Sequence, residues 1–144
     1  MQITRIEGGN GPHKAFNNDR IADFLFQHLD QYGDERKDIM KCLNYVFEKG
    51  GSISIAHEGE TMKGVVVLND TGMEGYIPEN ILVYIAVDAS TRGQGVGRKL
   101  IEDVQSKTKG SIALHVEPDN PAKKLYERLG FTNKYLEMRW TKAN

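Results

Sequence analysis

Val87-Asp88-Ala89-Ser90-Thr91-Arg92-Gly93-Gln94-Gly95-Val96-Gly97-Arg98 follows directly on the apolar run ILVYIAV at 81–87. An unbroken apolar run of this length predicts a central strand that is covered on both faces. The glycines of the quoted stretch permit backbone angles closed to other residues and leave the amide N–H groups of a helix start exposed. Because a helix N-terminus carries about half a positive charge, this junction predicts a phosphate-binding site.

The sequence after this junction alternates between helix and strand patterns. It predicts a helix over 95–107, a strand over 111–116, a helix over 121–129 and a final strand over 135–141. Asn120 is the expected N-cap of the third of these elements, with Pro121 at its first helical position. Gly130 fits the left-handed position past its end, and Phe131 is placed for the usual hydrophobic contact.

The sequence before the junction predicts an edge strand, two helices and a hairpin. The strand falls at 1–7, the helices at 19–31 (with Asn18 as N-cap) and 34–48, and the hairpin strands at 53–57 and 63–68. Strands that alternate with helices, together with one hairpin, are typical of an α/β fold with a mixed sheet. We therefore expect one domain over 1–144, with a six- or seven-stranded mixed sheet and about four helices.

Composition and net charge indicate which partners and which cellular compartment fit this chain. The chain has 144 residues and a formal net charge of -1, which gives no argument for a nucleic-acid or membrane partner. Its one cysteine, Cys42, excludes an intrachain disulfide and favours a cytoplasmic protein. Nothing approaches the ~20 apolar residues that span a bilayer, and the histidines show no metal-ligand spacing. We expect no metal, and the sequence leaves a homodimer open.

Two other phosphate-binding motifs do not fit the junction. The dinucleotide fingerprint G-x-G-x-x-G would need glycine at Arg98 or at Leu100, depending on where it starts. The triphosphate loop G-x-x-x-x-G-K-[ST] occurs nowhere in the chain.

The pattern Arg92-x-x-Gly95-x-Gly97 after an apolar strand instead resembles the acyl-CoA signature of the GNAT superfamily of N-acetyltransferases. That signature is Arg or Gln, two residues, Gly, one residue, then Gly or Ala. A second block, Asn120-Pro121-Ala122-Lys123-Lys124-Leu125-Tyr126-Glu127-Arg128-Leu129-Gly130-Phe131, is similar to the family's C-terminal helix and its Leu-Tyr-Glu-x-Leu-Gly-Phe ending. The resemblance is specific between about residues 82 and 131, and it is architectural before that.

The resemblance implies an enzyme that transfers an acetyl group from acetyl-CoA to a primary amine by direct attack in a ternary complex. It implies that the Val87 amide polarises the thioester carbonyl and that Tyr126 faces the thioester sulfur. It assigns the acetyl-CoA contacts to one set of residues: Ile85, Ala86, Val87, Arg92, Gly93, Gln94, Gly95, Val96, Gly97, Arg98 and Asn120. A CoA-binding regulatory module without turnover is the alternative function.

The proton acceptor is the least defined part of this hypothesis. The position that aligns with the family's glutamate is Ile81, which cannot serve, so we expect Glu79, two residues earlier on the same alternation, to act as base. His115, Glu117 and a water relay are alternatives. The acidic residues near the junction of the first two helices allow two interpretations, a solvated face or the mouth of a cationic acceptor site; they are Asp30, Asp34, Glu35 and Asp38.

Overall fold

The computed structural model describes all residues 1–144 and divides them into two compact units, Met1–Leu114 and His115–Asn144. The first unit is an α/β unit built on a five-stranded sheet, and the second contains one helix. In chain order the elements are β1 (Gln2–Glu7), α1 (Asn18–His28), α2 (Arg36–Glu48), β2 (Gly51–Glu58), β3 (Thr61–Asp70), β4 (Asn80–Val87), α3 (Val96–Lys107), β5 (Ile112–Leu114) and α4 (Ala122–Arg128), with short 3-10 turns at Gly8–Asn10, Asp30–Tyr32 and Ala89–Thr91. None of the helices is long and apolar enough to cross a membrane.

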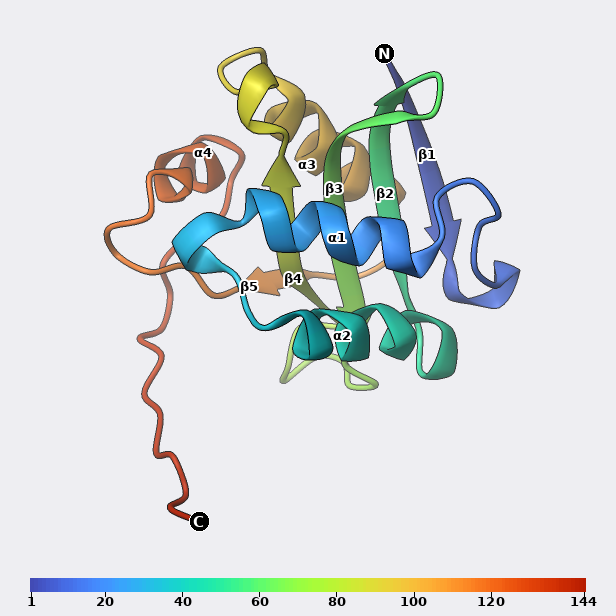
Figure 1. Cartoon of the computed structure of the whole chain (residues 1–144). Helices are drawn as coiled ribbons and strands as arrows, with labels where there is room; N and C mark the ends of the chain where they lie inside the picture. The colour runs from blue at the N-terminus through green and yellow to red at the C-terminus, as the bar shows by residue number, and fades with distance from the viewer. The chain divides into compact units, whose positions relative to one another are not determined.

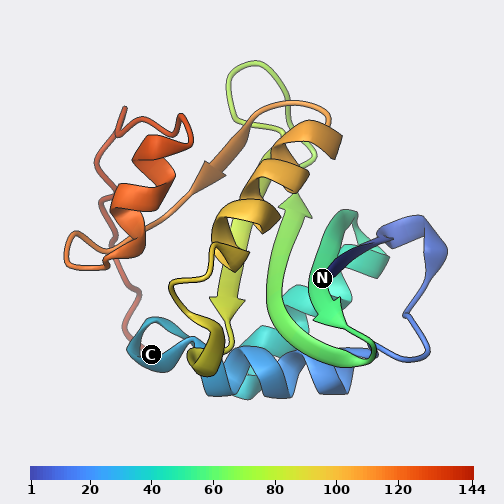
Figure 2. The same ribbon diagram turned by 90° about the horizontal axis from the view of Figure 1, so that it is seen from above.

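The strands of the first unit lie in the order β1-β2-β3-β4-β5. Strands β1 to β4 are antiparallel neighbours, whereas β5 runs parallel to β4 because α3 forms the crossover between them. Helices α1 and α2 cover one face of the sheet and α3 covers the other (Figures 1 and 2). The mixed α/β fold expected from the sequence is therefore confirmed.

Each face of the sheet has its own apolar core, and side-chain alternation along β3 shows how one strand supplies both. Val65 and Val67 pack with α1 and α2, whereas Val66 and Leu68 pack with α3. Each of these helices buries one stripe of apolar side chains. In α1 the helix starts where the Asn17 side chain accepts a hydrogen bond from Arg20 N (3.0 Å), one residue before the expected N-cap.

A β-bulge in β4 changes which residues of this strand face each core. Val67 pairs with Tyr84 and Leu68 pairs with Leu82, so Val83 is an extra residue without a partner on β3. The bulge reverses the alternation, and Leu82 faces the α3 core while Tyr84 faces the α1–α2 core. The central strand is thus covered on both faces, as its apolar run predicted.

The predicted sheet of six or seven strands is larger than the observed five-stranded one. Residues 135–141 form no strand, although their sequence alternates, because no second strand pairs with their backbone. Strand β5 is also shorter than its apolar pattern and covers only Ile112–Leu114. Alternation reports which residues can share a face, but a strand also needs a hydrogen-bonded neighbour.

Candidate active site

The first feature of the site is an unpaired edge along the second half of β4. Strand β5 pairs with β4 at only three positions: Asn80 with Ile112, Ile81 with Ala113 and Leu82 with Leu114. From residue 83 to residue 87, β4 has no strand on this side, whereas residues 84–87 pair with β3 on the other side. The backbone of 83–87 can therefore bond an extended ligand on that edge.

Backbone alternation identifies which amides face this edge. Asp88 N donates to Lys63 O of the neighbouring chain segment at 2.8 Å, so the amide of residue 88 points toward β3. Amides two residues apart in a strand point the same way, which turns Ala86 N–H toward β3 as well. The N–H groups of Ile85 and Val87 consequently face the unpaired edge.

The loop after β4 is held by a carboxylate and a histidine. The Asp88 side chain accepts hydrogen bonds from Ser90 Oγ (2.7 Å) and Ser90 N (2.9 Å), and the bond from the hydroxyl is the main cause that lowers the pKa of Asp88. His28 Nε2, at the end of α1, lies 3.7 Å from Asp88 Oδ2, and His28 Nδ1 accepts from Ala89 N at 3.3 Å. Neither residue could be predicted from the sequence, because His28 and Asp88 are 60 residues apart and no local pattern links them.

The start of α3 is open in the way a phosphate site requires. Gly93 and Gly95 have φ of +84° and +80°, and a Cβ at either position would meet no atom within 4 Å. Gly95 caps the helix without a side chain, and the first bond back to it comes from Lys99 N (3.1 Å). The three amides at 96–98 lie before that first bond and so have no partner within the helix. They can donate to an anion.

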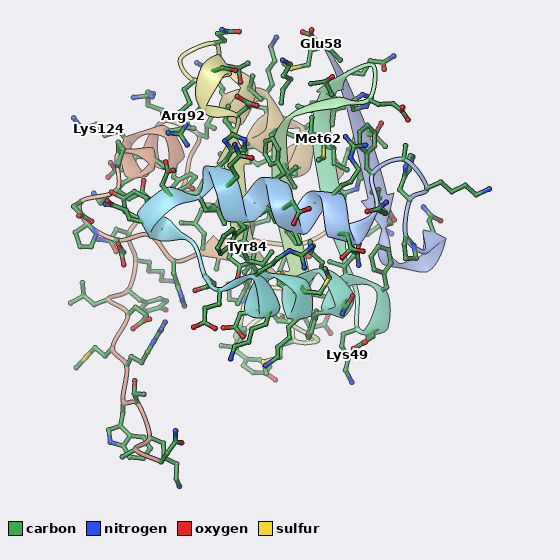
Figure 3. All side chains as sticks on the ribbon, in the orientation of Figure 1. Lys49, Glu58, Met62, Tyr84, Arg92 and Lys124 are labelled. Atoms are coloured by element: carbon green, nitrogen blue, oxygen red, sulfur yellow. The ribbon has the colours of Figure 1, made fainter.

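The charged side chains of this loop are partly neutralised by neighbours. Arg92 Nη2 donates to His28 O (2.9 Å) and to Asp30 Oδ2 (3.1 Å), which directs its guanidinium toward the end of α1 (Figure 3). Arg98 Nε lies 3.4 Å from Glu102 Oε1 on the surface of α3. Backbone amides therefore supply much of the anion-binding capacity, with Gln94 and Lys99 exposed beside them.

A buried tyrosine of β4 makes a second contact that the sequence did not predict. Tyr84 Oη donates to Asp34 Oδ2 at 2.5 Å, and Figure 3 shows Tyr84 between α1 and α2. Burial, followed by the Asp34 carboxylate, raises the pKa of Tyr84 well above its usual range. The phenol is thus a fixed donor that holds the start of α2 against β4.

The acidic residues at the α1–α2 junction each have a partner. Asp34 is bonded to Tyr84 and Asp30 to Arg92. Glu35, at the N-cap of α2, lies 3.5 Å from Lys37 Nζ, and Asp38 within α2 lies 3.7 Å from Lys41 Nζ. This arrangement supports the interpretation of a solvated, locally paired face.

Glu79 lies just before β4, at the opposite end of the strand from Val87. At ~3.3 Å per residue the length of β4 places roughly 25 Å between the two. Glu79 Oε1 accepts from Ser111 N at 2.8 Å, and this backbone bond is the main cause that lowers the pKa of Glu79. A lowered pKa makes a carboxylate a weaker proton acceptor, which argues against Glu79 as a strong base. The role of Glu79 as base stays a prediction.

The second unit carries the other two predicted site residues on and beside α4. Asn120 Oδ1 accepts from Ala122 N (2.9 Å) and leaves its amide N–H₂ group for another partner. The left-handed Gly130 (φ +96°) ends the helix, and Phe131 N donates to Tyr126 O at 3.0 Å. This is the helix ending that the sequence predicted.

Tyr126 is buried and packs edge-on against Phe131, with ring centroids 5.9 Å apart. Burial raises the pKa of Tyr126 to about 12. The phenol is therefore protonated at neutral pH and can donate its proton.

Comparisons with known proteins agree with this geometry. The family model of the acetyltransferase (GNAT) domain matches residues 45–133. A 5-NmdU N-acetyltransferase of Pseudomonas phage PaMx11 is 32% identical over 101 residues, which cover 69% of each chain.

Solved structures share the fold at low identity. An aminoglycoside N-acetyltransferase in complex with CoA has a TM-score of 0.69 and 18% identity, over 98% of this chain and 93% of that one. A ribosomal-protein-alanine N-acetyltransferase from Brucella melitensis biovar Abortus 2308 has a TM-score of 0.65 and 16% identity, over the full length of both chains. The match to the family model and the identity to the phage relative carry the conclusion: this chain belongs to the GNAT acetyltransferase domain family, and it is an acetyl-CoA-dependent acetyltransferase.

Proposed function

We propose that the protein transfers the acetyl group of acetyl-CoA to a primary amine by direct attack in a ternary complex. The observation that carries this proposal is the continuity between two features: the unpaired edge of β4 with the N–H groups of Ile85 and Val87, and the glycine-rich start of α3 that follows it. The first suits an extended pantetheine chain and the second suits a pyrophosphate. Together they would bind the two chemically distinct parts of one cofactor.

The proposed step follows from these donors. The Val87 N–H would donate to the thioester carbonyl and stabilise the negative charge that develops on its oxygen as the amine nitrogen attacks. The C–N bond forms, the C–S bond breaks, and CoA leaves as the thiolate. The amine loses one proton and the thiolate gains one, so the site needs an acceptor and a donor.

Tyr126 is the proposed donor. A thiol has a pKa near 8.5, so a phenol whose pKa is raised to about 12 gives its proton to the thiolate only against a difference of about three pKa units, and we propose that Tyr126 acts mainly by donating a hydrogen bond to the leaving sulfur, with the proton supplied by water. For the acceptor, Glu79 stays our first prediction, with His115, Glu117 and water as alternatives. The lowered pKa of Glu79 and its place at the far end of β4 favour a route in which water carries the proton.

The proposed acceptor amine is taken from the name of the phage relative. The phage enzyme that matches this chain is by its name an N-acetyltransferase of 5-NmdU. We therefore propose 5-NmdU as the first acceptor to test.

A thiol-release assay with acetyl-CoA over a panel of amines tests the proposal. The panel holds 5-NmdU, a lysine-containing peptide and an aminoglycoside, and calorimetry measures CoA binding in parallel. We expect CoA to bind and at least one amine to release thiol in proportion to acetylated product. Binding of CoA without turnover on any amine would favour the regulatory module, and failure of CoA to bind would refute the proposed site.

A further inference from the structure

The face of the sheet that α3 covers is apolar on β3 but polar on the neighbouring strands toward β1 (Figure 2). On β3, Val66 and Leu68 pack with α3. On β2, Ser54 and Ser52 lie opposite these two residues, and on β1, Arg5 lies opposite Ser54. Residues that lie opposite one another in a sheet share a face, so two serines and an arginine extend the apolar core of α3 with polar groups.

Several polar atoms of this cluster have no partner. Ser52 is 2% exposed and Ser54 is 0% exposed, and neither hydroxyl makes a hydrogen bond. Arg5 Nε donates to Glu7 Oε1 (3.3 Å) and Arg5 Nη2 donates to Thr108 Oγ1 (3.5 Å), whereas the buried Arg5 Nη1 has no acceptor. Buried polar groups are normally hydrogen-bonded, because an unpaired one costs free energy. The cluster is therefore short of hydrogen-bond acceptors.

Arg5 and Ser52 line a cavity of about 470 Å³. The end of α3 at Lys107 and the loop between β3 and β4 at Met73 form other parts of its wall. At 1.5 Å per residue, the 12 residues of α3 place the end of the helix about 18 Å from Gly95 at its start. The cavity is thus separate from the proposed pyrophosphate site.

We propose that this cavity binds a small oxyanion, a carboxylate or a phosphate group, through Arg5 Nη1 and the Ser52 hydroxyl. The N–H groups of a guanidinium match the oxygens of both anions, and hydrogen bonds between opposite charges are among the strongest in proteins. The anion would supply the acceptors that the cluster lacks. No step of the proposed acetyl transfer uses either residue, so this is a second ligand site of the protein.

The charges around the cavity leave Arg5 in need of a closer counter-charge. Its side chain is 15% exposed, whereas Glu7, the carboxylate bonded to it, is 62% exposed and remains largely in water. Glu79, also in the wall, accepts from Ser111 N and is turned to that bond. A charge that is largely removed from water is stabilised by a partner that is removed from water with it. An anion within the cavity meets this requirement.

Inorganic phosphate and acetate serve as probes of the full-length protein. Each is titrated into isotope-labelled protein at constant ionic strength, and amide chemical shifts are followed by NMR. We expect the amide signals of Arg5, Ser52 and Thr108 to shift and to saturate together. The probe that binds more tightly identifies the ligand group as phosphate or carboxylate. If neither probe shifts these three signals, the proposal is wrong.

Two variants separate this cavity from the start of α3, where phosphate should also shift the signals at 95–98. Arg5→Met should abolish the shifts at the cavity and retain those at 95–98, and Gly95→Glu should do the reverse. Lys41→Met removes an exposed cation from α2, on the other face of the sheet, and should retain both sets. Shifts at the cavity that persist in folded Arg5→Met would overturn the proposal.

Ser52→Ala gives a second test that leaves Arg5 in place. Without an anion, its urea midpoint should equal or exceed that of the wild type, because the hydroxyl has no partner to lose. Its dissociation constant for phosphate at the cavity should rise roughly tenfold, as expected for the loss of one hydrogen bond to a charged group. A lower midpoint would show that the hydroxyl already has a partner, and an unchanged dissociation constant would show that it does not contact the anion. Either result would contradict the proposed site.

Discussion

The two ends of β4 serve different purposes although they belong to one strand. At the closed end, 79–82, polar groups are satisfied within the unit: Asn80 Nδ2 donates to Lys109 O (2.8 Å) and Ser111 O (3.2 Å), and Glu79 accepts from Ser111 N. At the open end, 83–95, the edge of the strand and the start of α3 leave amide N–H groups without partners.

The difference shows how one strand can have its polar groups paired at one end and leave backbone donors available to a ligand at the other. Backbone groups that lack partners cost free energy when they are removed from water, so a fold retains them only where solvent or a ligand can reach them. The short pairing with β5 produces both ends at once. Strand β5 pairs with β4 at three residues and leaves the rest of this edge open for the cofactor contacts that we propose.

The largest effect is expected at the open end, from Gly95→Glu. A carboxylate at the start of α3 would lie against the proposed pyrophosphate, and two like charges a few ångströms apart repel by about 4 kcal/mol at an effective dielectric of 20. We expect acetyl-CoA affinity by calorimetry to fall about a hundredfold or more, in a protein that remains folded by circular dichroism.

Gly59→Glu is the matched control for this variant. Gly59 lies in the β2–β3 turn with φ of +55°, and its Cβ would also meet no atom within 4 Å. Both substitutions therefore impose a similar backbone strain of about 1–2 kcal/mol. The control should bind acetyl-CoA like the wild type, and equal affinity of both variants would remove the phosphate site from the start of α3.

The next effect concerns the proposed hydrogen-bond donor to the leaving sulfur. Tyr126→Phe keeps the ring beside Phe131 and removes the hydroxyl, so we expect turnover to fall roughly tenfold to a thousandfold while the dissociation constant of acetyl-CoA barely changes. Steady-state kinetics and calorimetry on the same sample measure the two quantities. Wild-type turnover would show that Tyr126 has a packing role alone and that the thiolate leaves without help.

At the closed end, Asn80→Ala should change stability and leave binding intact. The side chain is 5% exposed, and its loss leaves Lys109 O without this donor, whereas Ser111 O keeps the bond from Asn80 N (3.1 Å). We expect the free energy of unfolding to fall by about 1–3 kcal/mol, measured by urea titration. The exposed Asn10→Ala serves as control. A loss of acetyl-CoA affinity in folded Asn80→Ala would mean that the two ends are coupled.

The smallest effect is expected from Glu79→Gln. Glu79 has its pKa lowered below the ordinary 4.5, so its hydrogen bond to Ser111 N–H stabilises the fold above pH 4.5 and the contribution is lost as pH falls through the lowered value. Glutamine still accepts the bond but does not titrate, so unfolding of the variant should depend less on pH in this acid range.

The same variant tests the predicted base. Turnover is measured against pH for Glu79→Gln, His115→Gln and Glu117→Gln. A variant that loses the pH-dependent limb identifies the proton acceptor. If all three keep the wild-type profile, the proton leaves through water or the amine binds already neutral.

The sequence predicted the features that depend on local backbone chemistry. Glycines at 93 and 95 adopt left-handed angles, and Gly130 ends α4 as expected, because turn and cap geometry is set by a few neighbouring residues. The apolar run at 81–87 likewise predicted the central strand.

Contacts between distant segments could not be predicted in the same way. Nothing near Asp34 in the sequence signals that it meets Tyr84, and nothing near His28 signals that it meets Asp88. The strand expected at 135–141 was wrong for a related reason, since alternation specifies a face but not a neighbour.

The bulge at Val83 changes the alternation of side chains along β4. Before residue 83 the even-numbered side chains face α3, and after it they face α1 and α2. Strict alternation would place Leu82 and Tyr84 on one face, and the extra residue Val83 puts them on opposite faces. A deletion of Val83 would make the two residues adjacent in a regular strand, so each would keep its present face, with Leu82 still opposite Leu68 and Tyr84 still opposite Val67.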